Sequence, residues 1–110
     1  MPCTHTEARA LLARDADALL VAADDTGVVG TVIVGWDGWR GHLYRLVVEP
    51  RSRRLGIATR LVDEAKRRAR ALGAGKVDAM VALDNVGAVG FWERQGLERD
   101  HRDGRWTVRP

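Results

Sequence analysis

The sequence predicts one α/β (α+β) domain in which a mixed, mostly antiparallel central sheet is flanked by helices. Its 110 residues are enough for a single domain. The hydrophobic fraction of 45% is normal for a chain with a packed core. Three apolar, strand-like runs joined by short turns favour antiparallel neighbours. An amphipathic helix then leads to a fourth strand, and a helical crossover predicts that this strand runs parallel to the third.

The first element expected is a helix over residues 5–14. Thr4 and Glu7 stand three residues apart, which is the spacing of a capping box. The apolar residues that follow, Ala8, Leu11 and Leu12, recur at helical spacing.

Three strands are expected next, over Ala18–Ala23, Val28–Trp36 and His42–Glu49. An Asp-Asp-Thr-Gly sequence separates the first two runs, and Asp37-Gly38 opens the turn before the third. Because both connections are short, these runs predict a three-stranded antiparallel meander.

A long helix is expected over residues 57–72, because its apolar residues fall on one face and Gly73 ends it. Lys76–Leu83 then reads as the parallel strand. Asp84 or Asn85 caps the next expected helix.

That last helix is expected to run to Gln95 and to end at Gly96. After it, Leu97–Arg102 and Arg105–Val108 are expected to form a closing hairpin around Asp103-Gly104.

A basic loop between the third strand and the long helix is the strongest chemical signal, and it reads Arg53-Arg54-Leu55-Gly56-Ile57-Ala58. A helix N-terminus offers unpaired backbone N–H groups and the positive end of the helix dipole. Gly56 lets an anion come close to the backbone, since no Cβ blocks the approach. The arginines carry charge in a form that suits phosphate oxygens. The segment therefore predicts a site for a phosphorylated cofactor.

The net charge of +3 allows nucleic acid as a partner, but no recognition helix or nucleic-acid motif accompanies it. A nucleotide P-loop is not expected, because no Gly-Lys-Ser/Thr follows the glycine. We therefore expect no nucleic acid among the partners, and no metal.

The remaining composition argues for a protein without a membrane segment. No apolar run reaches the roughly 18 residues of a membrane span, and no signal peptide is visible. The single cysteine, Cys3, rules out an internal disulfide and favours a reducing, cytoplasmic location.

Two motifs in this order resemble those of the GCN5-related N-acetyltransferase (GNAT) superfamily. The first is the Gln/Arg-x-x-Gly-x-Gly/Ala loop, present as Arg53 to Ala58. The second is the Asn-x-x-Ala-x-x-Phe-Tyr-x-x-x-Gly-Phe block, which reads here as Asn85, Ala88, Phe91, Trp92, Gly96 and Leu97. The resemblance extends over residues 18 to about 97.

The resemblance implies acetyl-CoA as the donor and a sheet that splays between the fourth and fifth family strands. Loop amides would hold the pyrophosphate, and the backbone of the preceding strand would bind the pantetheine. The cofactor-binding residues it implies are Leu46, Val47, Val48, Arg53, Arg54, Leu55, Gly56, Ile57, Ala58, Thr59, Asn85 and Phe91.

The catalytic residues depart from the family pattern. Trp92 stands where many members place a Tyr that protonates the leaving thiolate, and an indole N–H is not a useful acid. His42, Tyr44, Leu46 and Val48 are expected to share one face of their strand, and none is acidic. His42 is then the candidate base, with Asp78 second through a water. The alternative is a strand histidine without a catalytic role.

The family usually begins with a strand and two helices, whereas this sequence is expected to lack the first strand and the first helix. The strand Ala18–Ala23 would then be an exposed edge. A second copy of the chain covering that edge would make a homodimer.

The function expected is transfer of acetyl from acetyl-CoA to a primary amine of a small-molecule or peptide acceptor, by direct attack in a ternary complex. The alternative is a CoA-binding protein with little catalysis, a sensor or an accessory subunit. Trp36 and Trp39, with Asp37 and Arg40, would form an aromatic wall for the acceptor or cover a core edge.

Overall fold

The structure is a computed structural model that describes residues 5–53, 55–81, 86–100 and 106–109. The chain divides into two compact units, residues 1–80 and 81–110. The first unit holds the sheet and the helices α1 and α2, and the second holds α3.

A four-stranded sheet with the strand order β1-β2-β3-β4 forms the centre of the first unit. Its strands are β1 (Leu19–Asp24), β2 (Gly27–Trp36), β3 (Gly41–Val48) and β4 (Val77–Ala79). β1, β2 and β3 pair antiparallel, and β4 pairs parallel with β3. The predicted mixed, mostly antiparallel sheet is therefore confirmed.

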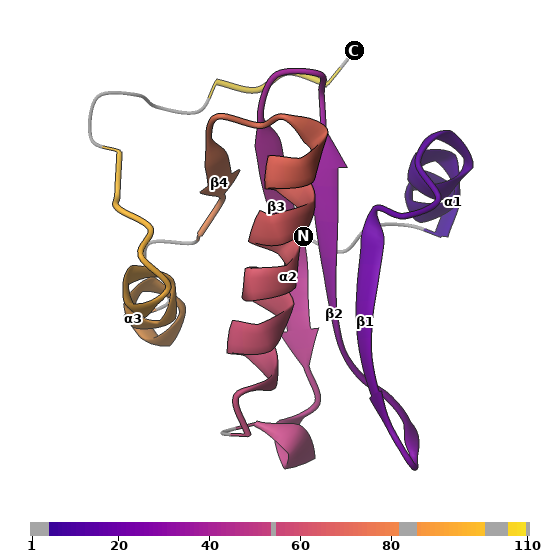
Figure 1. Cartoon of the computed structure of the whole chain (residues 1–110), viewed down its shortest axis with the longest axis vertical. Coiled ribbons are helices and arrows are strands. Elements are labelled where there is room, and N and C mark those ends of the chain that lie inside the picture. The colour runs from indigo at the N-terminus through magenta and orange to yellow at the C-terminus, as the bar shows by residue number, and fades with distance from the viewer. Residues whose placement is uncertain (1–4, 54, 82–85, 101–105, 110) are drawn as a thin grey trace. The chain divides into compact units, whose positions relative to one another are not determined.

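The helix α2 (Ile57–Leu72) lies across one face of the sheet (Figure 1). Its buried residues, Leu61, Val62, Ala65 and Ala69, recur at intervals of one turn, as the sequence predicts. The helix ends at Gly73, whose φ of 99° is the left-handed conformation that glycine adopts most easily. The N–H of Gly73 donates to the carbonyls of Ala69 and Arg70, so the predicted bounds and cap are confirmed.

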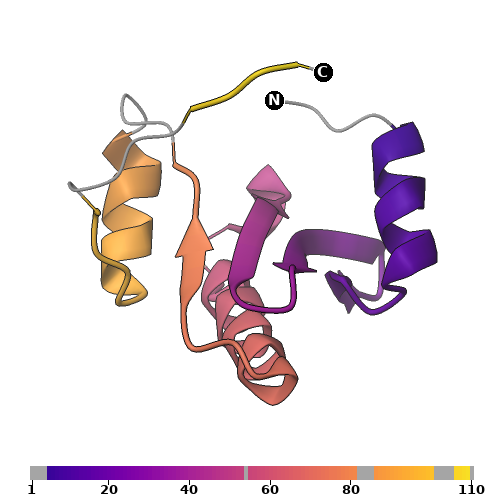
Figure 2. The same cartoon turned by 90° about the horizontal axis from the view of Figure 1, so that it is seen from above.

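The helix α1 (His5–Arg14) lies beside β1, on the side of the sheet away from α2 (Figure 2). Leu11 and Leu12 line a small cavity there together with Leu19 of β1 and Ile33 of β2. The apolar side of the predicted helix therefore faces the apolar residues of β1 and β2.

A β-bulge in β3 changes which side chains share a face. Arg45 has a φ of 56°, and the pairing of β2 with β3 shifts register at this point. Before the bulge, His42 pairs with Gly35, where an added Cβ would lie 2.8 Å from the Tyr44 ring, so His42 and Tyr44 share a face.

Beyond the bulge, Val48 pairs with Gly30, where an added Cβ would meet Leu61 and Ile57 of α2. Val48 therefore faces α2, and Leu46, two residues earlier, shares that face. The prediction that Leu46 and Val48 share a face with His42 is wrong, because the extra residue at Arg45 reverses the alternation.

The strand β4 is shorter than expected. Residues 76–83 were expected to form it, but the strand covers Val77–Ala79, and Met80 and Val81 lie outside it. Pairing with β3 ends at Leu43 opposite Ala79, just before the bulge. The two strands therefore splay from this point, because the bulge bends β3 and disrupts further pairing.

The second unit contains α3 (Val86–Arg94). Gly96 has a φ of 87°, and Leu97 N–H donates to Trp92 O over 3.1 Å, which closes the helix as predicted. Asp84 and Asn85, the predicted caps, lie outside the described residues.

The predicted closing hairpin is not seen where the structure describes it. Residues 97–100 and 106–109 form no strand, and Asp103-Gly104 lies outside the described residues. The first arm carries three charged residues in a row, Glu98, Arg99 and Asp100, which do not supply the alternation that a half-buried strand needs. In the part of the chain that the structure describes, no helix is long and apolar enough to cross a bilayer.

Candidate functional site

The loop between β3 and α2 begins with a short 3-10 turn at Pro50–Ser52 and ends at Gly56. Gly56 is the residue preceding α2, with a left-handed φ of 77° and no side-chain cap. The first amides of α2 therefore have no side-chain acceptor from this residue. An added Cβ at Gly56 would meet nothing within 4 Å, so an anion can approach the backbone directly.

Two arginines of the loop make contacts that fix its shape. Arg51 donates from Nε to Glu49 Oε2 and from Nη2 to Thr26 Oγ1, both over 2.6 Å, and so ties the loop to the β1–β2 turn. Arg53 donates from Nε to Val48 O over 3.3 Å. Arg54 lies outside the described residues. Both arginines thus lie in the segment that leads into α2, with the charge of Arg51 paired to Glu49.

The outer edge of β3, next to this loop, has backbone groups that pair with no strand among the described residues. Glu49 N–H donates to Val29 O over 2.8 Å. Because successive residues of an antiparallel strand alternate in direction, the N–H and C=O of Val48 face away from β2, as the bond from Arg53 to Val48 O requires. Among the described residues, no strand pairs with Leu46–Val48 on that side. An extended ligand can therefore bond to this edge as an added strand would.

The two candidate bases, His42 and Asp78, lie together at the paired end of β3 and β4. His42 Nδ1 is 2.8 Å from Asp78 Oδ1, and the residues are register partners. His42 Nε2 is 2.9 Å from Asp37 Oδ2. The hydrogen bonds to Asp37 and Asp78 raise the pKa of His42 above its usual 6.5.

Asp37 was expected in the turn beside the acceptor, with Trp36 and Trp39, but its contact with His42 was not predicted. Its Oδ1 accepts from the backbone N–H groups of Trp39 and Arg40, over 2.8 and 2.7 Å. These bonds and that from His42 lower the pKa of Asp37 to about 2. An aspartate that starts a turn five residues before a strand histidine is the signal that was available.

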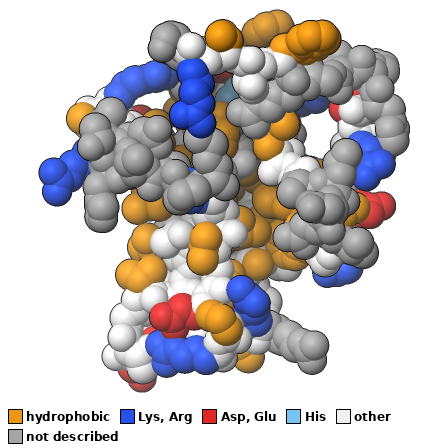
Figure 3. Space-filling view, turned by 180° about the vertical axis from the view of Figure 1, so that it is seen from behind, with side chains coloured by type: hydrophobic (Ala, Val, Ile, Leu, Met, Phe, Trp, Pro, Cys, Tyr) orange, Lys and Arg blue, Asp and Glu red, His pale blue; other side chains and the backbone are white. Residues whose placement is uncertain are grey.

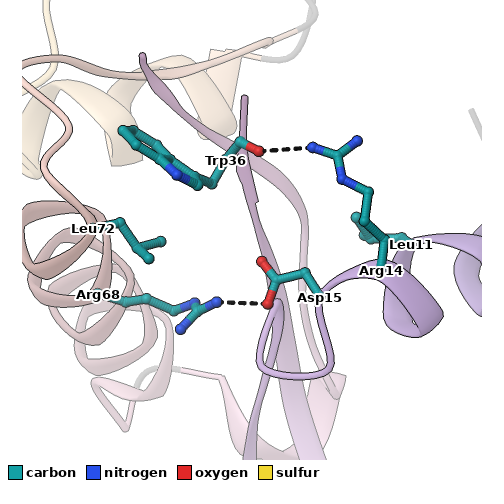
Figure 4. A pocket seen from close by; sticks show the side chains of 6 residues that line it. All are labelled: Leu11, Arg14, Asp15, Trp36, Arg68 and Leu72. Carbon is teal, nitrogen blue, oxygen red and sulfur yellow. Dashed lines mark hydrogen bonds and ion pairs between the residues drawn. The ribbon is translucent and has the colours of Figure 1, made fainter. Parts of the chain in front are cut away.

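The two tryptophans near this turn serve different surroundings. Trp39 is 72% exposed, and the guanidinium of Arg40 lies 4.6 Å from its ring centroid, a cation–π contact. Trp36 instead lines a pocket of about 250 Å³ with residues of α1 and α2 (Figure 4). In the described residues they form no common aromatic wall.

This pocket is held together by charged side chains. Arg68 Nη2 pairs with Asp15 Oδ1 over 2.7 Å, and Arg14 Nη2 donates to Trp36 O over 3.1 Å (Figure 4). Leu11 and Leu72 supply its apolar lining. The residues that line this pocket come from α1 and the residue after it, from α2 and from the end of β2. None of them belongs to the loop or to the His42 cluster, so the pocket is not part of the site described above.

The remaining predicted site residues lie in two places. Ile57, Ala58 and Thr59 form the first turn of α2, directly after Leu55 and Gly56. Phe91 and Trp92 lie in α3, with ring centroids 5.3 Å apart and an edge-to-face geometry. Asn85 lies outside the described residues. No group of three or more His, Cys, Asp or Glu side chains among the described residues is arranged to hold a metal ion.

Comparison with known proteins gives a family and a fold. The profile of a family described as acetyltransferase (GNAT) family matches residues 1–97. The aminoglycoside 6'-N-acetyltransferase AAC(6')-IG from Acinetobacter haemolyticus is similar in structure, with a TM-score of 0.75 and 22% identity over 96% of this chain and 79% of that one.

Two structures with bound bisubstrate analogues are also similar. Naa20 from Chaetomium thermophilum has a TM-score of 0.77 and 22% identity over 86% of this chain and 57% of its own. AAC(6')-Iy, solved with CoA-S-monomethyl-acetylneamine, has a TM-score of 0.77 and 19% identity over 96% of this chain and 78% of its own. At these identities the likeness establishes the fold.

Proposed function

The chain belongs to the GNAT acetyltransferase family, and on this premise we propose that it transfers an acetyl group from acetyl-CoA to a primary amine, by direct attack in a ternary complex. The observation that carries the proposal is the outer edge of β3 running into the uncapped start of α2 at Gly56. These two features suit the two halves of one extended, phosphorylated ligand.

The residues present fit acetyl-CoA. The amides that follow Gly56, in Ile57, Ala58 and Thr59, suit its pyrophosphate, because Gly56 provides no side-chain cap and has no Cβ where an anion would approach. Arg53 and Leu55 complete the described part of the loop, and we retain Arg54 in the site on the sequence motif. When bound, acetyl-CoA supplies an activated acetyl carbonyl and a thiolate leaving group.

The edge of β3 would hold the rest of the donor. The backbone N–H of Val48 faces the side where β4 has diverged, and we propose that it and the backbone of Leu46 bond to the pantetheine amides. Asn85 and Phe91 remain proposed cofactor contacts from the sequence motif.

The acceptor amine must lose a proton to attack, and we propose His42 as the group that accepts it, with Asp78 beside it. Because its pKa is raised, the neutral base becomes more abundant at alkaline pH. The acceptor class in our proposal is a small-molecule or peptide amine. The name of AAC(6')-IG and the analogue bound to AAC(6')-Iy point to small-molecule amines for those two proteins. A cytoplasmic location and a homodimer are part of the proposal.

A second candidate function is CoA binding with little catalysis. It is favoured by Trp92, which occupies the position of the family's acidic Tyr, since an indole N–H cannot protonate a thiolate. Turnover of a panel of amines separates the two candidates, because both predict CoA binding and only the enzyme predicts acetylated product.

Calorimetric titration with acetyl-CoA, repeated with CoA, tests the loop. Gly56→Glu should abolish binding, because it puts bulk and negative charge where the phosphates would lie. Gly73→Glu is the matched control: Gly73 also has a left-handed φ and open space, at the other end of α2. Equal affinity of wild type and Gly56→Glu would reject the loop as the donor site.

A further inference from the structure

We propose that Asp37 is a positioning residue that selects the tautomer of His42. It keeps a proton on Nε2, so that Nδ1, which faces Asp78, is the nitrogen that gains and loses the exchangeable proton. The catalytic consequence rests on the proposed function, whereas the tautomer itself does not.

A neutral His42 has one N–H for its two contacts with Asp37 and Asp78. Both ring nitrogens of His42 lie within 3 Å of carboxylate oxygens, at 2.9 Å from Asp37 and 2.8 Å from Asp78. A neutral imidazole has one N–H donor and one lone pair, whereas imidazolium has two donors. Only the imidazolium satisfies both contacts, and loss of its proton must break one of them.

Asp37 is the carboxylate that retains its hydrogen bond. Its other oxygen accepts from the amides of Trp39 and Arg40, so its position is fixed by the turn. Among the described residues, the carboxylate of Asp78 has no hydrogen-bond partner besides His42 to fix its position. The proton that leaves is therefore the one between Nδ1 and Asp78.

The charged surroundings agree with this assignment. The groups that act on the pKa of His42 are Asp37, the stronger, and Asp78, and both raise it. On the strand of His42 itself, the Tyr44 ring lies 6.2 Å away. In the turn, the guanidinium of Arg40 lies over Trp39.

Deprotonation creates a place for an amine. The Nδ1 lone pair and the Asp78 oxygen then face each other at hydrogen-bond distance with no proton between them, so they repel unless a donor bridges them. A neutral amine or a water supplies that donor. In the reaction, the acceptor amine gives one proton to Nδ1 as its own nitrogen bonds to the acetyl carbon, and the thiolate departs with the electron pair of the broken C–S bond.

Nitrogen-15 NMR of imidazole-labelled protein tests the tautomer directly, with His42 assigned by its loss in His42→Gln. At alkaline pH the wild type should carry its proton on Nε2. In Asp37→Asn the amide oxygen keeps the backbone bonds, so its NH₂ group faces Nε2 and should move the ring proton to Nδ1. Asp78→Asn is the matched control and should keep the Nε2–H form.

A wild type with Nδ1–H, or an Asp37→Asn variant with an unchanged tautomer, would overturn the proposal. The kinetic readout is separate: Asp37→Asn should lower kcat by about 10²-fold and change the pH–rate profile, with the affinity for acetyl-CoA unchanged. An unchanged profile together with a switched tautomer would refute His42 as the base. Failure of the wild type to bind acetyl-CoA would refute the proposed function and leave the tautomer result intact.

Discussion

At the residue scale, the protonation of His42 connects stability to chemistry. The imidazolium bonds to Asp37 and Asp78 at once and joins the 37–40 turn, β3 and β4. Its 25% exposed side chain lies where the two strands are still paired, one residue before the last pair. A change in its charge therefore acts on the part of the sheet that sets where the splay begins.

His42→Gln should reveal this link as a pH-dependent loss of stability. The folded-state pKa of His42 is raised above 6.5, so its contribution to stability is fully present below pH 6.5 and is lost as pH rises through the raised value. The difference in unfolding free energy between wild type and variant should therefore be largest in mild acid and shrink at alkaline pH. Urea unfolding across this range measures it. A difference that grows with pH would contradict an imidazolium of His42 that bonds to both carboxylates in the folded protein.

At the element scale, the sequence predicts the bounds of an element where its apolar residues repeat at a regular spacing. The helices at 5–14 and 57–72 were predicted with the observed bounds, because their apolar residues repeat at helical spacing and Gly73 has an evident role. The role of Gly56 was also predictable, because a glycine before a helix has no Cβ to keep an anion from the backbone.

The bulge in β3 had no such signal. Five of the six residues from 43 to 48 are apolar or aromatic, so the run shows no alternation that would mark where the register shifts. The early end of β4 follows from the bulge, so the sequence held no signal for it either. The contact of Asp37 with His42 was missed for a related reason, because it depends on how the turn folds.

Substitution of Arg45 tests the bulge. Arg45→Val should lower the free energy of unfolding by about 1–2 kcal/mol, because a β-branched residue is strained at a left-handed φ. Arg45→Gly should change it by no more than about 1 kcal/mol, since glycine adopts this conformation freely but costs more entropy to order. Urea denaturation of both variants gives the comparison. If Val proved the more stable substitution, residue 45 would have to lie in a regular strand.

At the scale of the first unit, α1 covers only part of one face of the sheet, and one edge of the sheet is unpaired among the described residues. Hydrophobic side chains gather on the face away from α2 (Figure 3), where Val21 and Val47 are 54% and 57% exposed. Val21 and Val47 are both register partners of Thr31, so they lie in one row across the sheet. Within the described residues, β1 pairs only with β2, and its outer edge is unpaired. An open edge beside apolar side chains favours strand pairing with another chain.

The proposed homodimer uses this edge, with β1 of one copy beside β1 of the other. Val21→Lys should convert the dimer to a monomer, because a charge at the centre of β1 would be desolvated and would face its equivalent in the second copy. Light scattering after size-exclusion chromatography measures the mass. Val28→Lys is the control, since Val28 is equally exposed at 54% but lies on β2, at the turn end of that strand. A wild type that is monomeric at every concentration would refute the dimer, and dissociation by Val28→Lys alone would move the interface away from the centre of β1.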